Sequence, residues 1–195
     1  MLLFCFQILT ACPGSVNKDK GLKKLKANHY DFSDFKRFYH KGIYFYLPDY
    51  FSQDYNKAYL YKKDGISLAS YSSGIYFSCE RFDEEELKDY KFAFEDKKSD
   101  VEVVHAFYLE QRKKSFDNAK VSFLHKIKRK NNFKAVYQVA EGSKYAFGSE
   151  MNYYIATTEK KVKNQTYYYV FQLISSKEMS AYLLDDFRKM LRDLE

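Results

Sequence analysis

The sequence predicts an α+β fold, in which a mainly antiparallel sheet of hairpins is flanked by helices. Three observations predict it: apolar and polar residues alternate between turn residues, two capped helical segments lie mid-chain, and residues 175–195 are strongly amphipathic. Alternation is typical of a half-buried strand, whereas an apolar stripe at a spacing of three to four residues is typical of a helix packed on a core.

Turn residues separate the predicted strands in the first half of the chain. The segment 42–48, GIYFYLP, reads as a strand that ends at its proline. Asp64-Gly65 is typical of a type I′ hairpin turn, which needs a positive φ at both central residues. Ser73-Gly74 indicates a second turn. The two turns predict a three-stranded meander over residues 57–63, 66–72 and 75–81.

Two helix starts follow this meander. Asp83 and Glu86 have the spacing of a capping box, and Ser99 and Glu102 repeat it. The apolar residues after Ser99 fall on one helical face, and His105 lies on the same face. We therefore expect a packed imidazole at His105 rather than a metal ligand.

Alternation returns between residues 121 and 139. Val121, Phe123 and Ile127 are expected on one face of a strand, and a turn at Asn131-Asn132 leads into the next strand. A last hairpin is predicted to turn at residues 163–165.

The last helix is the strongest local signal in the chain. Ser175 and Glu178 have the spacing of a cap, so the helix is expected to begin there. Its apolar stripe predicts that the helix covers the sheet, and consists of Met179, Tyr182, Leu183, Phe187, Met190, Leu191 and Leu194.

Length and composition indicate one domain with an N-terminal extension. The 195 residues are 46% hydrophobic, which is enough for a core. We expect a signal peptide over residues 1–11, a lipidated cysteine and flexible lysine-rich tether over 12–29, and one globular domain over 30–195. The formal net charge of +7 is compatible with a nucleic acid, an anionic membrane or an acidic partner, and also with nothing more than an AT-rich coding sequence.

The first eleven residues, MLLFCFQILTA, carry no charge. They are too few to span a bilayer and match the apolar core of a signal peptide. Leu9-Thr10-Ala11-Cys12 resembles the lipobox of bacterial lipoproteins. By that resemblance, cleavage occurs between Ala11 and Cys12, and the sulfur of Cys12 carries lipid. The alternative is a buried N-terminal segment in which Cys12 is a small hydrophobe.

The resemblance to a lipobox implies a location outside the cytosol. We expect it at the periplasm or cell surface, held by the lipid on Cys12, with the outer membrane favoured. Cleavage would remove Cys5, and lipid would occupy Cys12, so Cys79 would have no partner for an intrachain disulfide. Its alternating apolar surroundings predict a packed core thiol.

The body resembles a second family. The opening GIYFYLPDYF and the ending YYYVFQLISSKEMSAYLLDDFRKMLRDLE are similar to the first strand and to the last strand and helix of PsbP-like and Mog-like domains. This resemblance implies an α/β/α sandwich over about residues 38–195. It also implies a role in binding macromolecules, without a shared active site.

Searching for chemistry in the sequence gives no catalytic motif. The four histidines lack metal-ligand spacing, and no nucleophile elbow, Walker or Rossmann glycine pattern occurs. We expect no metal and no cofactor. The preferred function is a non-catalytic, membrane-tethered module that binds an envelope protein or polymer and no nucleic acid. Two alternatives remain open, an envelope hydrolase or transferase with an unrecognised site and a cytosolic nucleic-acid binder.

A partner surface is predicted where aromatic residues leave the strand pattern. Tyr50, Phe51 and Tyr55 fall in a connection, where exposed rings would bury much area on binding at little entropic cost. The alternative is that these rings cover the end of the sheet.

Overall fold

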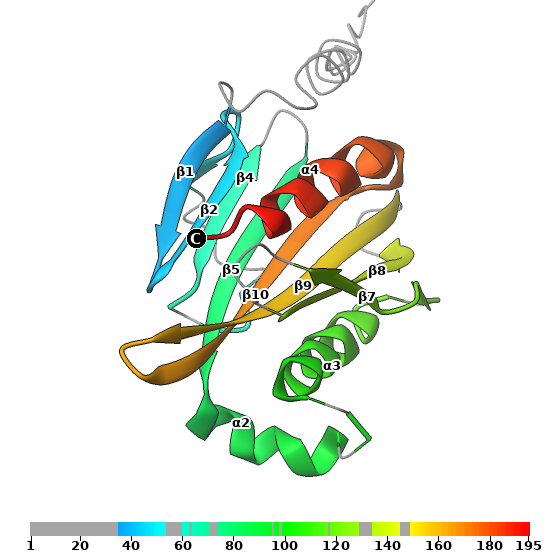
Figure 1. Cartoon of the computed structure of the whole chain (residues 1–195). Coiled ribbons are helices and arrows are strands. Elements are labelled where there is room, and N and C mark those ends of the chain that lie inside the picture. Colours follow the sequence, from blue (N-terminus) through cyan, green and yellow to red (C-terminus); the bar gives the residue numbers. More distant parts are fainter. Residues whose placement is uncertain are drawn as a thin grey trace, which may run out of the picture.

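An eight-stranded antiparallel sheet forms the centre of the molecule (Figure 1). The computed structural model describes residues 35–53, 60–62, 64–70, 74–94, 96–97, 99–116, 118–128, 134–144 and 149–195. The strands are β1 (Phe35–His40), β2 (Ile43–Pro48), β3 (Ser52–Gln53), β4 (Ile66–Ser70), β5 (Ile75–Asp83), β6 (Lys120–Val121), β7 (His125–Lys128), β8 (Lys134–Lys144), β9 (Ser149–Val162) and β10 (Gln165–Ser176). The helices are α2 (Glu84–Lys91), η2 (Phe92–Phe94), α3 (Asp100–Lys113), η4 (Lys177–Met179) and α4 (Ser180–Arg192).

The strand order of the large sheet is β3-β4-β5-β10-β9-β8-β6, and β7 also pairs with β8. The longest pairing joins β9 to β10 through Lys163 and Asn164, whose φ angles are +48° and +67°. A positive φ at both turn residues is the requirement of a type I′ hairpin. The hairpin predicted at residues 163–165 is therefore confirmed, and it supplies the two central strands.

Alternation along the strands divides the core between the two faces of the sheet. Phe77, Phe171 and Tyr154 point toward α4 and pack against Leu183 and Phe187. The opposite face packs against α2 and α3, with Phe82, Val104, Tyr108, Ile155 and Val170 among its buried residues. The predicted α+β class and its antiparallel sheet between helices are thus confirmed, and α4 covers the sheet as its stripe predicts.

Strands β1 and β2 form a separate two-stranded hairpin beside α4 (Figure 1). Glu195 exchanges two backbone hydrogen bonds with Tyr44 of β2, at 2.9 and 3.0 Å. The Glu195 carboxylate also pairs with Arg37 at 2.6 Å and accepts from the Tyr46 hydroxyl at 3.1 Å. The last residue of the sequence therefore fastens α4 to the hairpin.

Two of the three predicted helix caps are confirmed. The Asp83 side chain accepts from the backbone of Glu86, while the Glu86 side chain accepts from the backbone of Asp83. Ser99 caps α3 by accepting from the backbone of Glu102. The cap predicted at Ser175 and Glu178 is wrong, because β10 continues to Ser176 in register with β9 and α4 begins at Ser180 without a side-chain cap.

The predicted meander is only partly correct. Gly74 has a φ of +61° between the paired strands β4 and β5, as a turn requires. Asp64 and Gly65 do not have positive φ, and the described residues 60–62 form no strand. Gly65 is instead required for close packing, since a Cβ there would lie 2.8 Å from Cγ of Glu80.

The strand predicted around residue 123 is interrupted. β6 and β7 pair separately with β8, and Phe123 between them is 90% exposed rather than buried beside Ile127. The turn predicted at Asn131-Asn132, and the expected features of residues 1–34, lie outside the described residues. Within the described part of the chain, no helix has the length and apolar character needed to span a membrane.

Gly142 provides a stability test of the packing beneath α3. A Cβ at this position would lie 2.7–2.8 Å from three atoms of Phe116, whose buried ring packs edge-on against Tyr153. Gly142→Ala should therefore lower the free energy of unfolding by about 2 kcal/mol, because Phe116 must shift within a packed core. Urea denaturation measures this loss.

The packing test has an internal control. In a Phe116→Ala background the colliding ring atoms Cγ and Cδ1 are absent and only Cβ of the three nearest atoms remains, so Gly142→Ala should cost less than it does in the wild-type chain. Equal costs in the two backgrounds would contradict the proposed collision.

Candidate ligand-binding site

A cavity of about 420 Å³ lies where α4 meets β7 and β8. Its lining is basic and aromatic, and consists of His125, Lys126, Ile127, Tyr137, Arg188 and Arg192. We call this cavity the basic cleft. Its residues come from two paired strands and a helix, so it is built on the rigid part of the fold.

His125 and Tyr137 are placed together by the strand register. They are direct partners in the antiparallel pairing of β7 and β8, so their side chains share one face of the sheet. The imidazole stacks on the phenol ring with 4.6 Å between centroids and 14° between planes. The pair forms a flat wall of the basic cleft.

Arg188 of α4 contacts Tyr137. Its Nε donates to the Tyr137 hydroxyl at 2.9 Å, and its guanidinium lies 5.4 Å from the centre of the Tyr137 ring. A neighbouring carboxylate, Asp185, lies 3.5 Å from the Nη1 atom of Arg188. The Tyr137 contact fixes the orientation of the guanidinium.

Arg192 follows Arg188 by four residues, so both lie on the same side of α4. Its side chain is exposed, and it forms no ion pair with a described residue. The helix dipole favours a cation in the last turn, which accounts for a basic residue there. It does not account for two arginines that line the same cavity.

Lys126 lines the basic cleft differently from the other residues. It alternates with His125 and Ile127 along β7 and therefore points to the opposite face of the sheet. There its amine pairs with Glu102 of α3 at 3.0 Å. We therefore assign the positive charge of the basic cleft to Arg188 and Arg192.

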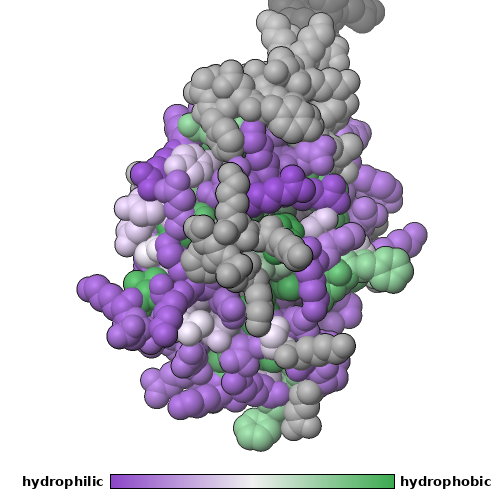
Figure 2. Space-filling model, viewed as in Figure 1, coloured by the Kyte–Doolittle hydropathy of each residue, from purple (hydrophilic) through white to green (hydrophobic). Residues whose placement is uncertain are grey.

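The surrounding surface carries no broad apolar patch where its residues are described. Figure 2 shows mostly hydrophilic residues on the side from which α4 is seen, with hydrophobic residues singly or in small groups between them. Phe92 and Phe123, which are 84% and 90% exposed, are the most exposed large hydrophobic residues described. A polar ligand therefore suits this side better than a large apolar partner.

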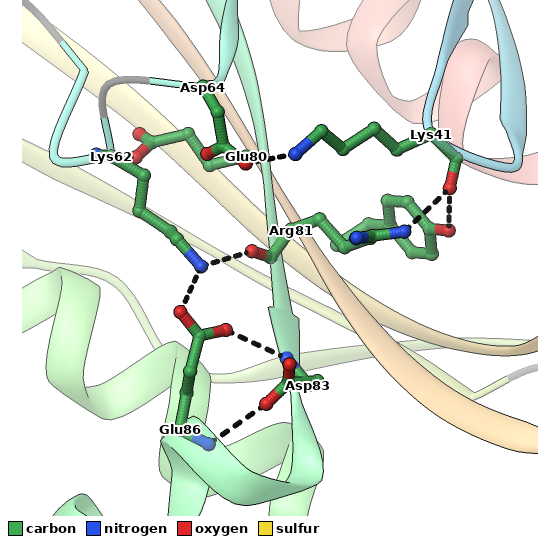
Figure 3. Close-up of polar contacts among 8 residues, drawn as sticks. Lys41, Lys62, Asp64, Glu80, Arg81, Asp83 and Glu86 are labelled. Atoms are coloured by element: carbon green, nitrogen blue, oxygen red, sulfur yellow. Dashed lines mark hydrogen bonds and ion pairs between the residues drawn. The ribbon is translucent and has the colours of Figure 1, made fainter.

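A second polar cluster joins the β1–β2 turn to β5 and α2 (Figure 3). Lys41 pairs with Asp64, and the Lys62 amine pairs with Glu86. Arg81 and the Tyr169 hydroxyl both donate to the Lys41 carbonyl, at 3.3 and 2.8 Å. Since these contacts satisfy one another, the cluster is a structural connection between segments.

A layer of buried polar side chains lies between α3 and the sheet. Gln172 donates from Nε2 to Glu80 at 2.9 Å and to Ser78 at 3.2 Å, and its Oε1 accepts from Arg112. The His105 imidazole contacts Thr157 at 3.1 Å and Gln138 at 3.2 Å. His105 is 2% exposed, so the predicted packed imidazole is confirmed, and burial lowers its pKa to about 4.

One residue of the aromatic surface predicted from the sequence is buried in the structure. Phe51 is 2% exposed and packs against Tyr50 and Phe77, which corrects its assignment to a partner surface. Tyr50 is partly buried with its hydroxyl enclosed, and burial raises the pKa of Tyr50. Both rings belong to the core between the sheet and α4, because the chain turns back onto the sheet after Pro48. Tyr55 lies outside the described residues.

Two other sequence predictions concern cysteines. Cys79 is a free thiol with no exposed surface, so the packed core thiol is confirmed, and burial raises the pKa of Cys79. Ala11 and Cys12, the predicted cleavage and lipid sites, lie outside the described residues. Among the residues that the structure describes, no cluster of three or more His, Cys, Asp or Glu side chains is placed to hold a metal ion.

Sequence reasoning missed the residues of the basic cleft. The available signal was the pair Arg188 and Arg192, which stand next to the apolar stripe of the last helix. Their meeting with His125 and Tyr137 depends on the strand register and on how α4 packs, and local patterns specify neither.

Comparisons with known proteins identify similar solved structures and no family. No protein-family model matches the chain, and no curated protein is significantly similar to it in sequence. One similar solved structure is LpqN of Mycobacterium tuberculosis, involved in cell envelope biogenesis, which is 11% identical with a TM-score of 0.49 over 89% of this chain and 94% of LpqN.

Two further solved structures have similar scores. The yeast Ran-binding protein Mog1p, from Saccharomyces cerevisiae, is 8% identical with a TM-score of 0.48 over 83% of this chain and 94% of its own. A protein of unknown function from Pseudomonas aeruginosa, PA94, is 12% identical with a TM-score of 0.45 over 82% of this chain and 94% of its own. Mog1p is thus among the solved structures to which the chain is similar.

Proposed function

We propose that this chain is a lipoprotein of the bacterial cell envelope, tethered through lipid on Cys12, that binds an envelope component in the basic cleft without transforming it. The observation that carries the binding role is the cavity itself, in which two arginines and a stacked His125–Tyr137 pair converge on one space. Ligand sites of this kind are concave, with a few polar groups placed by a rigid scaffold.

The chemistry of the lining supports binding rather than catalysis. The described residues that line the basic cleft include no carboxylate, thiol or aliphatic hydroxyl. Nucleophilic catalysis needs such a group beside a base, and His125 is instead stacked face to face on Tyr137. Cations and a phenol hydroxyl can hold and orient an anion.

The lipobox-like segment supports the tether. Leu9-Thr10-Ala11-Cys12 follows an uncharged run and precedes a lysine-rich segment, as an anchored domain with a spacer requires. Each buried CH₂ contributes about 0.8 kcal/mol to membrane binding, and two or more acyl chains hold a protein stably. A doubly or triply acylated Cys12 would keep the basic cleft close to a membrane surface.

Cys12→Ser tests the anchor directly. In a bacterial host supplied with labelled palmitate, the wild-type chain should take up label and fractionate with membranes. The Cys12→Ser chain should take up none and shift to the aqueous fraction, because a serine oxygen does not receive the diacylglyceryl group.

The matched control for this experiment is Cys5→Ser, which changes the same chemical group within the predicted signal peptide. It should keep both the label and the membrane location. Labelling of the Cys12→Ser chain would refute Cys12 as the attachment site.

A further inference from the structure

We infer that the basic cleft binds a phosphate group, carried either by a small soluble molecule or by a lipid head group. This inference rests on the proposed function, since it names the chemical class of the ligand for the same cleft. It depends on the number of charges that converge, on their orientation and on the size of the cavity.

The charge of the basic cleft exceeds what a carboxylate would need. A single guanidinium can satisfy a carboxylate through two parallel hydrogen bonds, yet here two guanidiniums lie one helical turn apart. A phosphate monoester carries about 1.5 to 2 negative charges near neutral pH and has three strong acceptor oxygens. It therefore matches Arg188 and Arg192 together in both charge and number of acceptors.

The described ion pairs of the residues that line the basic cleft compensate the charge of its two arginines only in part. Asp185 is the described carboxylate paired with Arg188, through a 3.5 Å contact between side chains that are 35% and 48% exposed. An exposed pair with such a long contact contributes little and competes weakly with a ligand. Glu102 faces the other side of the sheet, where it pairs with Lys126.

Arg188 is oriented before any ligand arrives. Its Nε is held by the Tyr137 hydroxyl at 2.9 Å, and the Tyr137 ring is itself buried and stacked against His125. Fixing a long side chain in advance lowers the entropic cost of binding. Arg192 is exposed and lines the same cavity, so it supplies a second, adaptable contact.

The cavity is larger than a bare phosphate. Its volume of about 420 Å³ lies within the range typical of small-molecule sites, so it accommodates a phosphate together with part of the group that bears it. The stacked His125–Tyr137 pair and the partly buried Ile127 offer that group a flat, partly apolar wall.

The first arm of the test uses soluble ligand. Glycerol 3-phosphate is titrated calorimetrically into the full-length chain held in neutral detergent, and into its Arg192→Gln variant. The dissociation constant should rise about tenfold or more in Arg192→Gln, because one charged hydrogen-bonding partner is lost. Arg192→Lys should recover part of the affinity, since it keeps the charge and loses the two-pronged geometry.

The matched control is Lys161→Gln, which removes one positive charge from an exposed position near the end of β9, outside the basic cleft. It should leave the affinity within about twofold of wild type, because exposed charges that do not touch the ligand are screened. Melting curves of the unliganded variants show whether both remain folded.

The second arm distinguishes the two sources of phosphate. Cys12→Ser chains, which lack the lipid anchor, are sedimented with phosphatidylcholine vesicles with or without phosphatidic acid. If the ligand is a lipid head group, phosphatidic acid should increase the vesicle-bound fraction of Arg192→Gln less than that of Lys161→Gln. If the ligand is a soluble molecule, phosphatidic acid should increase the bound fraction of both variants equally, while Arg192→Gln still weakens the binding of glycerol 3-phosphate measured by calorimetry.

The inference is overturned if Arg192→Gln and Lys161→Gln are indistinguishable in both arms. That result would leave the tether untouched, because palmitate labelling at Cys12 does not depend on the basic cleft. Conversely, phosphate binding that depends on Arg192 in a chain that takes up no palmitate would support the site and refute the anchor.

Discussion

Replacing Glu80 by glutamine should lower the free energy of unfolding by about 3 kcal/mol, although the two side chains have the same shape. Glu80 is fully buried, and both of its oxygens act as acceptors: Oε2 accepts from the Lys62 backbone at 2.6 Å, and Oε1 accepts from Gln172 at 2.9 Å. An amide has only one oxygen, so in Glu80→Gln an NH₂ group would face one of these donors. Figure 3 shows Glu80 directed toward the segment that carries Lys62.

The charge of Glu80 adds to this cost. Burial raises the pKa of the Glu80 carboxyl, while the Lys62 backbone N–H and the positive charge of Arg112 oppose that rise. Glu80→Gln removes the negative charge that compensates Arg112 beneath α3. Urea denaturation at neutral pH measures the loss, with an unchanged m-value showing that the folded state is equally compact.

Glu110→Gln is the matched control, because Glu110 lies on α3 and pairs at the surface with Lys113 at 2.8 Å. Removal of such an exposed pair should change stability by less than about 0.5 kcal/mol. A loss in Glu80→Gln no larger than that in Glu110→Gln would show that the buried acceptors contribute nothing specific.

Acid should destabilise the protein through His105. Burial lowers the pKa of His105 from its ordinary value of 6.5 to about 4, against the opposing influence of Gln138 and Glu102. Between these two values the unfolded chain binds a proton that the folded chain does not. The contribution of neutral His105 is therefore fully present above pH 6.5, declines as pH falls toward 4, and amounts to about 3 kcal/mol across that window.

The hydrogen bonds of His105 explain why the neutral ring is retained. Gln138 donates its Nε2 to the Ser122 carbonyl at 2.8 Å, so its Oε1 accepts from Nε2–H of the imidazole. The Thr157 hydroxyl then donates to the unprotonated Nδ1. Protonation of Nδ1 would remove this acceptor while placing a charge in the α3 core.

Two measurements check the acid prediction. The pH dependence of the free energy of unfolding should be shallower in His105→Asn than in wild type between pH 6.5 and 4, because asparagine does not titrate. In the intact wild-type chain, the carbon-bound ring protons of His105 should titrate with a midpoint near 4 by NMR. A midpoint near 6.5 would contradict the effect of burial.

Local sequence signals predicted those features that local physics decides. The caps at Asp83 and Ser99 need only a side chain that reaches a backbone amide three residues away. The turn at Lys163 and Asn164 likewise depends on the φ angles of two adjacent residues. Such features depend little on the rest of the fold.

Signals of the same kind failed where pairing between strands was stronger. Ser175 and Glu178 have the spacing of a cap, but Ser175 continues β10 opposite Asn152 of β9. Gly65 follows an aspartate as in a hairpin turn, but its lack of a side chain serves the close approach of Glu80. In both cases, contacts between distant segments outweigh a local preference.

The residues of the basic cleft could not be predicted from local sequence patterns. Tyr137 lies 12 residues after His125 in the sequence, and Arg188 lies 51 residues after Tyr137. Their meeting requires β7 to pair with β8 in one register and α4 to pack in one orientation. No periodicity within either segment encodes that combination.

The contacts of the two helix layers have a mechanical consequence. The contacts of α3 with the sheet include directional bonds from His105 and Arg112, so a slide of one residue would break several of them at once. The contacts of α4 with the sheet are largely apolar, through Leu183, Phe187 and Leu191, but the Glu195–Tyr44 backbone bonds and the Arg188–Tyr137 bond hold the helix in place. Any adjustment to a bound ligand should thus be confined to the exposed side chain of Arg192, while both helix layers stay fixed.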